Sequence, residues 1–400
     1  MVEQSELETQ WSMIIDDSGV QRAAEALAAG NGPAGVDAER ASGFTYGSEA
    51  YLVQVYRRGA GTFLFDPIGI SDFSPLADAL RDVEWIFHAA SQDIPCLDEI
   101  GLHPPHLFDT ELAARLLGYE RVGLGSVVEQ LLGISLEKAH SAADWSQRPL
   151  PESWLEYAAL DVALLPELRD LIYADLVAND KLEYAEQEFE AVRTKPEKPK
   201  AAEPWRKLAN GPTLRSARSL ALVRELWTAR DELARSRDVA PGRLIPDKSV
   251  IAAAAANPRS KNDLARLQTF RGRASRTEID RWWDAIRRGK VTEDLPGPKP
   301  RDPDSIPHHR GWAHRHPEAA TRLAAARTAV EGEAERQHMP AENLITPDFV
   351  RRLAWSPPED LSVENVAKTL VDLGARDWQA ALTAPILASV FVENIQTDSN

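Results

Sequence analysis

The chain has 400 residues, of which 43% are hydrophobic and 27% are charged, and its formal net charge is −16. This balance indicates a folded globular protein of more than one domain and excludes a disordered chain. The single cysteine, Cys96, excludes an intrachain disulfide and a cysteine-based zinc site. No apolar run approaches the roughly 20 residues that span a bilayer, and the acidic N-terminus lacks a signal-peptide pattern. We therefore expect a cytoplasmic protein without a membrane partner.

The charge is unevenly distributed along the chain. Residues 1–192 hold 11 Lys and Arg against 34 Asp and Glu, a net of −23, and residues 193–400 hold 35 against 28, a net of +7. Within the second half, residues 205–292 hold 20 basic and 9 acidic side chains, a net of +11. This basic segment is a candidate surface for a polyanion. The acidic half would need bound divalent cations to approach phosphate.

Strand and helix patterns alternate in the first half of the chain. In order, we expect a strand over 11–17, a helix over 19–29, a break at 30–33, strands over 35–40, 50–57 and 61–66, a helix over 72–80, a strand over 83–88, a helix over 92–100, a strand ending at 108–110, and helices over 111–117, 125–132 and 152–178. The turn at 59–61 predicts that the strands on either side of it continue an antiparallel meander. Ser71 or Asp72 is expected to cap the helix over 72–80, and Asp109 the helix over 111–117. Pro166 is expected to kink or divide the last helix.

The second half shows no strand pattern, and residues 213–290 and 316–392 each predict a bundle of short helices. Pro- and charge-rich linkers lie before and between them. The two bundles look like copies of one unit about 100 residues apart, because the segments 241–250 and 340–350 both place Leu-Ile after Pro and then a Val in a common register. Residues 309–395 hold 9 basic and 12 acidic side chains, so only the first copy suits phosphate.

Two carboxylates lie close together on one expected strand. Asp37 and Glu39 point to the same face because strand side chains alternate, and such a pair on an interior strand needs a cation or a proton between its members. A lone Asp-x-Glu is most often a solvated edge strand. Downstream, Asp93 follows a strand, and Tyr157 and Asp161 lie one turn apart on a helix. The four carboxylates can converge at one sheet edge, where an all-oxygen set suits Mg²⁺ or Mn²⁺ and argues against zinc.

The order Asp37-x-Glu39, Asp93, Tyr157-x-x-x-Asp161 resembles the three motifs of the DEDD superfamily of 3′→5′ exonucleases, in the subgroup with Tyr in the third motif. Within that superfamily, the chain resembles the ribonuclease D family in four segments: 65–70, 87–89, 108–110 and 144–150. The basic helical unit resembles the HRDC domain. The resemblance implies a ribonuclease H-like α/β exonuclease with a mixed central sheet flanked by helices, followed by two all-α helical-bundle HRDC-type domains. The implied boundaries are an exonuclease domain over 1–192, a linker over 193–212, an HRDC domain over 213–293, a Pro-rich linker over 294–315 and a second HRDC-like domain over 316–395. Ala38 and Arg40 depart from the family's usual Thr and Phe.

The resemblance implies a catalytic mechanism with two metal ions. The catalytic and metal-binding residues would be Asp37, Glu39, Asp93 and Asp161 around two Mg²⁺ or Mn²⁺ ions, with Tyr157 orienting the attacking water. The implied reaction trims RNA 3′ ends, of stable RNA such as precursor transfer RNA, and releases nucleoside 5′-monophosphates. Candidate nucleic-acid contacts are His88, Arg271, Arg273, Arg276, Arg287 and Arg288. The ordinary alternative for His88 is a packed histidine at the end of a strand. For the five arginines it is a solvated charged surface.

Two other functions fit the sequence. One is the same chemistry on DNA, because discrimination between the two polymers rests on contacts to the 2′-hydroxyl, which the motifs do not specify. The other is a nucleic-acid-binding protein with an inactive nuclease site, against which the complete carboxylate set argues. A metal-dependent phosphatase is a distant third, without support from the helical repeats. The oligomeric state is not specified by the sequence, and a monomer is the default expectation.

Overall fold

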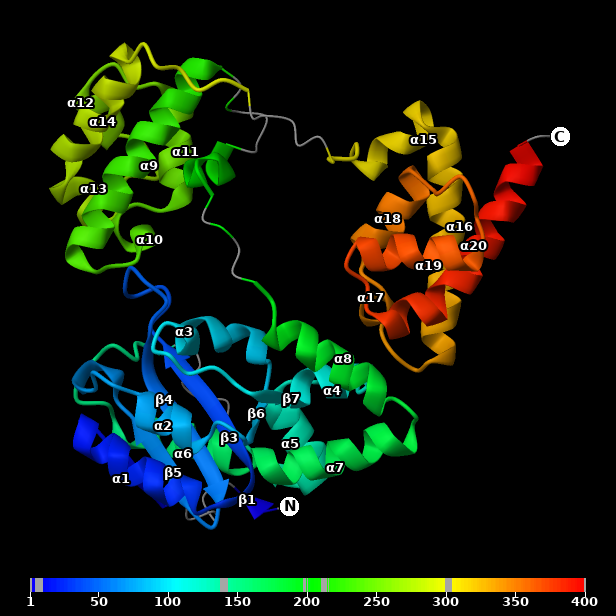
Figure 1. Cartoon of the computed structure of the whole chain (residues 1–400). Coiled ribbons are helices and arrows are strands. Elements are labelled where there is room, and N and C mark those ends of the chain that lie inside the picture. The colour runs from blue at the N-terminus through cyan, green and yellow to red at the C-terminus, as the bar shows by residue number, and fades with distance from the viewer. Residues whose placement is uncertain are drawn as a thin grey trace.

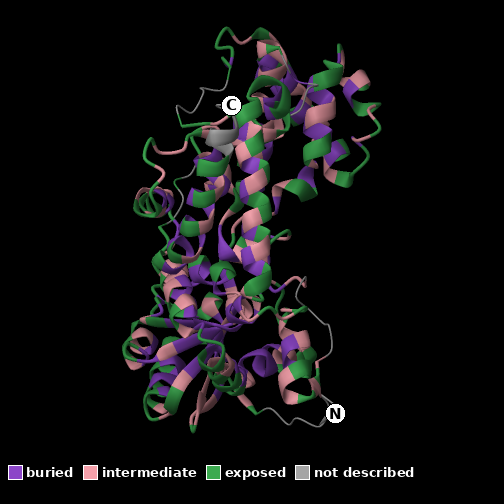
Figure 2. Ribbon diagram, turned by 90° about the vertical axis from the view of Figure 1, so that its right-hand side faces the viewer, coloured by how far each residue is buried: buried purple, intermediate pink, exposed green. Residues whose placement is uncertain are grey.

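The computed structural model describes residues 2–3, 10–136, 143–196, 199, 201–209, 214, 216–298 and 304–398. A six-stranded sheet with flanking helices forms the N-terminal half, and two all-helical domains follow it (Figure 1). Buried residues concentrate in the sheet and on the inward faces of the helices (Figure 2). This arrangement confirms the predicted fold class. None of the described helices combines the length and hydropathy needed to cross a membrane.

The sheet has the strand order β2-β5-β4-β3-β6-β7. Its strands are β2 (Trp11–Ile14), β3 (Asn31–Arg40), β4 (Ala50–Arg58), β5 (Gly61–Phe65), β6 (Glu84–Phe87) and β7 (His106–Asp109). The antiparallel pairs β3–β4 and β4–β5 confirm the meander, and β3 pairs in parallel with β6 on its other side. A separate parallel pair joins β1 (Val2–Glu3) to β8 (Ile134–Ser135). β3 is therefore an interior strand, bonded on both sides.

Helices cover both faces of this sheet. They are α1 (Asp17–Ala28), α2 (Ser74–Ala79), α3 (Ile94–Asp98), α4 (Thr110–Leu116), α5 (Leu124–Leu132), α6 (Glu152–Ala163), α7 (Leu165–Ala178) and α8 (Leu182–Arg193), with 3₁₀ turns η2 (Pro67–Gly69) and η3 (Ala90–Gln92). α6 packs on β3, β4 and β5, and α7 packs on β3 and β6. The expected division of the long helix is confirmed, since Pro166 lies in the first turn of α7. Asp109 caps α4 as expected, through the Glu111 and Leu112 amides.

Two local predictions were wrong. The segment 30–33 does not interrupt the chain before the strand, because β3 already begins at Asn31; its Gly and Pro residues instead produce a register shift between Asn31 and Ala34. The helix expected from Asp72 begins at Ser74, and the residue at its N-cap is Phe73, without a side-chain hydrogen bond. The Asp72 carboxylate accepts from the Ser74 amide and hydroxyl, so it forms a local turn ahead of the helix.

The second half contains two helical domains. The first comprises α9 (Ala217–Arg237), α10 (Pro241–Leu244), α11 (Asp247–Ala256), α12 (Lys261–Ala265), α13 (Arg273–Thr277) and α14 (Ile279–Val291), after the 3₁₀ segment η4 (Pro204–Ala209). The second comprises α15 (Trp312–Arg315), α16 (Pro317–Arg336), α17 (Ala341–Leu344), α18 (Pro347–Trp355), α19 (Val363–Asp372) and α20 (Asp377–Asp398), after η5 (His309–Gly311). The expectation of short helices was wrong for α9, α16 and α20, which have 21, 20 and 22 residues.

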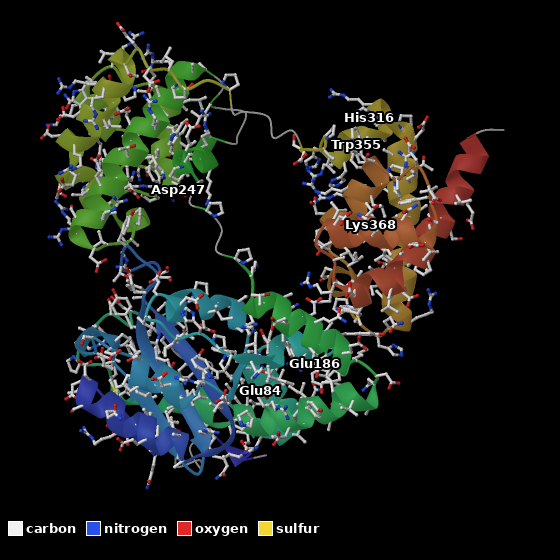
Figure 3. All side chains as sticks on the ribbon, viewed as in Figure 1. Glu84, Glu186, Asp247, His316, Trp355 and Lys368 are labelled. Atoms are coloured by element: carbon white, nitrogen blue, oxygen red, sulfur yellow. The ribbon has the colours of Figure 1, made fainter. Side chains whose placement is uncertain are left out.

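The internal repeat is confirmed by the structure. In each copy a one-turn helix (α10, α17) precedes a longer one (α11, α18), and the Leu-Ile pair between them is buried. Val250 and Val350 are buried at matching positions. In the second domain, His316 meets Trp355 edge-on with ring centroids 4.6 Å apart (Figure 3). The domain boundaries given above remain a prediction.

The second helical domain packs on the N-terminal domain through α8. Glu188 accepts hydrogen bonds from Arg376 at 2.5 Å and from the Trp378 indole at 3.1 Å, and the Tyr184 ring stacks on Trp378. Lys181, which is buried, donates to the carbonyl oxygens of Leu116 at 2.6 Å and Gln337 at 2.5 Å. A buried ammonium with carbonyl partners on two domains fixes their relative position.

The first helical domain contacts the loop between β3 and β4. Tyr46 in this loop donates its hydroxyl to Asp231 at 3.0 Å and its amide to Asp238 at 3.1 Å. Arg243 of α10 donates to the Gly43 carbonyl at 2.6 Å, with its guanidinium 4.0 Å from the Phe44 ring centroid. Figure 1 shows the loop reaching from β3 and β4 toward α10. The strand that carries the Asp-x-Glu pair thus leads directly into an interdomain contact.

Candidate active site

The strand β3 presents Asp37 and Glu39 toward α6. A Cβ at Gly35 would lie 2.5 Å from the Val162 carbonyl oxygen, so this face of β3 is pressed against α6. Side chains two residues apart share a face, and Asp37 and Glu39 therefore follow Gly35 on the α6 side. Gly35 permits the close approach that brings the helix over the carboxylates.

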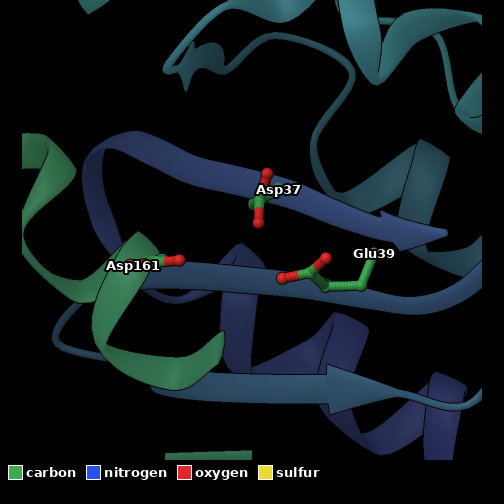
Figure 4. A group of neighbouring side chains, drawn as sticks. All are labelled: Asp37, Glu39 and Asp161. Atoms are coloured by element: carbon green, nitrogen blue, oxygen red, sulfur yellow. The ribbon is translucent and has the colours of Figure 1, made fainter. Parts of the chain in front are cut away.

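The helix α6 supplies the third carboxylate. Asp161 is 8% exposed, lies in the last turn of α6, and hydrogen bonds with Tyr157 one turn earlier. Asp37, Glu39 and Asp161 each offer a carboxylate oxygen such that all three oxygens lie within 4.8 Å of one another. Figure 4 shows the three groups directed into one space from the strand and the helix. The convergence expected of these residues is found.

Asp93 approaches the same space from the end of β6. It is 5% exposed and lines one pocket together with the three clustered carboxylates, but it is not within 4.8 Å of all of them. Its position depends on Asp109, whose carboxylate accepts from the Ala89 and Ala90 amides, each at 2.9 Å. Ala89 has a φ of 70°, an unfavourable conformation that these bonds hold in place. Asp109 was expected only as a helix cap, and its second function requires the pairing of β6 with β7.

The pocket has a volume of about 210 Å³. It is lined by Asp37, Ala38, Glu39, Arg40, His88, Gln92, Asp93, Leu124, Tyr157, Asp161 and Leu165. The Arg40 guanidinium lies 3.9 Å from the Asp93 carboxylate with 28% of its side chain exposed. The residue that departs from the family motif therefore brings a positive charge to the pocket.

Burial and mutual repulsion raise the pKa values of the acidic cluster. Burial, followed by the charges of the other carboxylates, raises the pKa of Glu39 to about 9. The pKa values of Asp37, Asp93 and Asp161 are also raised, in each case chiefly by burial, while Arg40 lowers those of Asp37 and Asp93. Carboxylates in this condition ionise when a cation neutralises them. An all-oxygen donor set of this kind fits Mg²⁺ or Mn²⁺.

His88 lies in the pocket wall as a neutral imidazole. Its Nδ1 is 2.9 Å from the Thr110 hydroxyl, which itself donates to the Phe87 carbonyl at 3.0 Å. Nδ1 therefore carries the proton, and burial lowers the pKa of His88 to about 4. A neutral ring gives no charge attraction for phosphate, and the predicted nucleic-acid contact of His88 stays a prediction.

Two of the segments that carry the family resemblance meet beside α6. Arg148 binds the Asp66 carboxylate through two nitrogens, at 2.6 and 2.7 Å, and also donates to the Tyr51 and Trp145 carbonyls. A bidentate pair with these extra bonds fixes the segment that precedes α6. The helix bearing Tyr157 and Asp161 is positioned by this anchor.

Comparison with known proteins supports the same assignment along most of the chain. Residues 11–176 match a family model described as 3'-5' exonuclease, residues 219–286 match the HRDC domain, and residues 305–391 match a 3' to 5' exonuclease C-terminal domain. A ribonuclease D of Pseudomonas paraeruginosa is 30% identical over 316 residues, covering 78% of this chain and 81% of that protein. The chain belongs to the ribonuclease D family. It is a 3′→5′ exoribonuclease by family, and its carboxylate cluster suits the divalent ions that such exonucleases use.

Solved structures agree with this membership in the ribonuclease D family. A protein from Bifidobacterium adolescentis is 36% identical with a TM-score of 0.86, over 95% of this chain and 97% of that one. Escherichia coli RNase D, described as an exoribonuclease involved in structured RNA processing, is 26% identical with a TM-score of 0.70, over 96% and 99%. The second helical domain matches the C-terminal model and the first matches the HRDC model, so the two repeats belong to distinct families within one architecture.

The predicted arginine contacts of this ribonuclease D family member lie on its HRDC domain. Arg287 forms an ion pair with Asp284, and Arg288 pairs with Glu225 at 3.1 Å. The remaining three have exposed side chains without an ion pair among the described residues, and we call them the HRDC arginine cluster: Arg271, Arg273 and Arg276. The cluster lies at α13, which packs on α10, the helix that contacts the β3–β4 loop. Unpaired guanidinium groups are the ones available to phosphate.

Proposed function

We propose that this ribonuclease D family member removes nucleotides one at a time from the 3′ ends of structured RNA by hydrolysis with two metal ions. The observation that carries the proposal is the cluster of Asp37, Glu39 and Asp161, with oxygens within 4.8 Å, in one pocket with Asp93 and Tyr157. The raised pKa values of Glu39 and Asp161 support this proposal, because a bound cation would stabilise the ionised form of these buried carboxylates. The products would be nucleoside 5′-monophosphates.

Four carboxylates would hold the two ions. Asp37, Glu39 and Asp161 have the required proximity, and Asp93 adds a carboxylate that lines the same pocket. The chemistry that two Mg²⁺ or Mn²⁺ ions would supply, if held by these carboxylates, is activation of a water and stabilisation of the departing 3′ oxygen. The buried positions of Asp93 and Asp161 keep these ligands in a low-dielectric setting, where charge interactions are strong.

Tyr157 would act as a hydrogen-bond donor. Its pKa is raised above the usual phenol value by burial and by the neighbouring Asp161, so the hydroxyl keeps its proton at neutral pH. It already bonds with Asp161 on the same helix face. Because this proton is donated to Asp161, the phenol oxygen could accept a hydrogen bond from the attacking water and orient it without taking the water's proton. We expect Tyr157→Phe to lower kcat while leaving divalent-ion affinity nearly unchanged.

The substrate class follows from the family and from the HRDC domain. The E. coli relative acts in structured RNA processing, and stable RNA such as precursor transfer RNA is the corresponding substrate proposed here. The HRDC arginine cluster supplies the positive surface that the acidic exonuclease domain lacks. Cytoplasmic location and a monomeric state complete the proposal.

The Asp37→Asn variant tests the metal site. Loss of a ligand carboxylate should lower the Mg²⁺-dependent rate on a 3′-tailed RNA by roughly 100-fold or more, because several kcal/mol of transition-state stabilisation are removed. Asp98→Asn, on the neighbouring helix α3 and outside the pocket, should retain full activity. A folded Asp37→Asn protein with near-normal activity would contradict the assignment.

Matched RNA and DNA oligomers test the substrate. With one 3′-tailed hairpin made in both polymers and one metal concentration, we expect kcat/KM to favour RNA. Equal or higher kcat/KM on DNA would support a DNA exonuclease instead. Absence of hydrolysis on both, in the presence of Mg²⁺ and Mn²⁺, would indicate a binding protein.

A further inference from the structure

Gln54 is a fully buried amide at the centre of the sheet. It lies on β4, is 0% exposed, and neither its Nε2 nor its Oε1 has a hydrogen-bond partner among the described residues. Its neighbours along the strand, Val53 and Val55, are both buried and apolar. An amide left unsatisfied in such a place costs about 1–3 kcal/mol, and a side chain of the same size without polar atoms avoids that cost. Packing alone therefore favours leucine at this position.

The register of the sheet places Gln54 beside the carboxylate cluster. Gln54 is the cross-strand partner of Asp37 in the β3–β4 pair. Cross-strand partners point to the same face, with Cβ atoms about 4.5–5.5 Å apart. The helix α6, which carries Asp161, covers this face, because the backbone of α6 closely approaches Gly35 on the same face of β3. The amide thus lies on the α6 side of the sheet, and it is not among the pocket-lining residues.

A carboxylate that binds a metal ion with one oxygen needs a donor for the other. The Ala38 backbone amide lowers the pKa of Asp37, so it interacts favourably with the ionised carboxylate. The Arg40 guanidinium is engaged on the other side, 3.9 Å from Asp93. Gln54 has the nearest side-chain donor that the strand register supplies to Asp37, and the amide has two N–H groups to offer. Outer hydrogen bonds of this kind orient metal-ligating carboxylates.

We propose that Gln54 is a positioning residue, whose Nε2 donates to the Asp37 oxygen directed away from the metal ions. The inference rests on the proposed function, because it presumes that Asp37 is a metal ligand. In the present rotamer Nε2 does not bond with Asp37, and χ2 and χ3 of Gln54 are the torsions that would turn the amide. The amide acts through the carboxylate and does not touch the RNA. It fixes which oxygen of Asp37 faces the ions.

Two substitutions separate positioning from packing. Gln54→Leu removes both polar atoms, and Gln54→Met keeps the unbranched shape if leucine prevents folding. Leu64→Met is the matched control, because Leu64 is the partner of Gln54 on its other side, in β5, and is equally buried. Each full-length protein is stripped with chelator and titrated calorimetrically with Mn²⁺ alone, and its unfolding by urea is followed without metal.

We expect Gln54→Leu and Gln54→Met to bind Mn²⁺ at least about tenfold more weakly than the wild type, while their metal-free urea midpoints stay equal or rise. Activity lost at low Mn²⁺ should return at saturating Mn²⁺. Leu64→Met should keep wild-type affinity. Wild-type affinity in both Gln54 variants, or an equal loss in Leu64→Met, would overturn the positioning function. Failure of the wild-type protein itself to bind Mn²⁺ would instead overturn the metal site, and the two failures are therefore distinguishable.

Discussion

Replacing Glu39 with glutamine should stabilise the metal-free protein while destroying its metal site. Burial and the neighbouring carboxylates raise the pKa of Glu39 from 4.5 to about 9. The folded protein therefore binds a proton more tightly at this group than the unfolded chain does. The resulting destabilisation is absent below pH 4.5, grows from pH 4.5 to about 9, and is constant above that. Glutamine is neutral at every pH and carries no such cost.

The size of the effect follows from the distance between pH and the unfolded pKa. At pH 8 that distance is about 3.5 units, which at about 1.36 kcal/mol per unit gives up to about 5 kcal/mol. We expect Glu39→Gln to be the more stable protein by a few kcal/mol at pH 8 and equal to the wild type at pH 4.5. Saturating Mn²⁺ should reverse the order at pH 8, because only the wild type gains the full binding energy.

Urea unfolding of the full-length proteins, followed by tryptophan fluorescence at both pH values with and without Mn²⁺, measures these differences. Glu156→Gln is the control, since Glu156 is exposed on the outer face of α6 and outside the pocket. A Glu39→Gln protein that is less stable than the wild type by the same amount at both pH values would refute the electrostatic reasoning. The change would then reflect lost contacts.

Three other variants are informative. Arg40→Gln should tighten Mn²⁺ binding several-fold in calorimetry, because a divalent ion is repelled twice as strongly as a proton; weaker binding would contradict this. Alanine at the whole HRDC arginine cluster should weaken RNA binding and reduce the slope of log affinity against log salt by about 2, whereas Arg336→Ala should leave the slope unchanged. Tyr46→Ala removes the hydroxyl bond to Asp231 and should loosen the HRDC domain against the loop and increase the radius of gyration in X-ray scattering, whereas an unchanged radius would show that the bonds of the Tyr46 amide and of Arg243 are enough to hold the contact.

The carboxylate cluster was predictable because each part is encoded locally. Strand alternation fixed the shared face of Asp37 and Glu39, and helical spacing fixed that of Tyr157 and Asp161. The meander followed from a short Gly-containing turn, and the fold class from alternating patterns. Bringing the strand and helix together required the family resemblance, since no local rule relates residue 39 to residue 161.

Other features depend on partners that are distant in sequence. Gln54 stands in the run Leu-Val-Gln-Val, which predicts only a buried strand, and its relation to Asp37 requires the register of β3 on β4. Asp109 could be recognised as a helix cap, but its bonds to the turn before Asp93 require the β6–β7 pairing. Tyr46 stands in a polar loop, and its partners lie 185 and 192 residues away. Such contacts carry no periodicity that a sequence can reveal.

The β3–β4 loop links the carboxylate cluster to the HRDC domain. Residues 37 and 39 of β3 face the pocket, and the loop that β3 enters after Arg40 is held by Asp231, Asp238 and Arg243 of the HRDC domain. The HRDC domain is therefore attached to the strand that supplies two carboxylates of the cluster, and not only to a linker. Displacement of the HRDC domain would pull on the end of β3, where a register shift between Glu39 and Arg40 already interrupts the pairing. The pairing of β3 with β6 covers Ala34 and Gly35, whereas the end of β3 next to Glu39 pairs with β4 alone. A displacement of the HRDC domain would therefore act first on this irregular end and on the Glu39 carboxylate beside it.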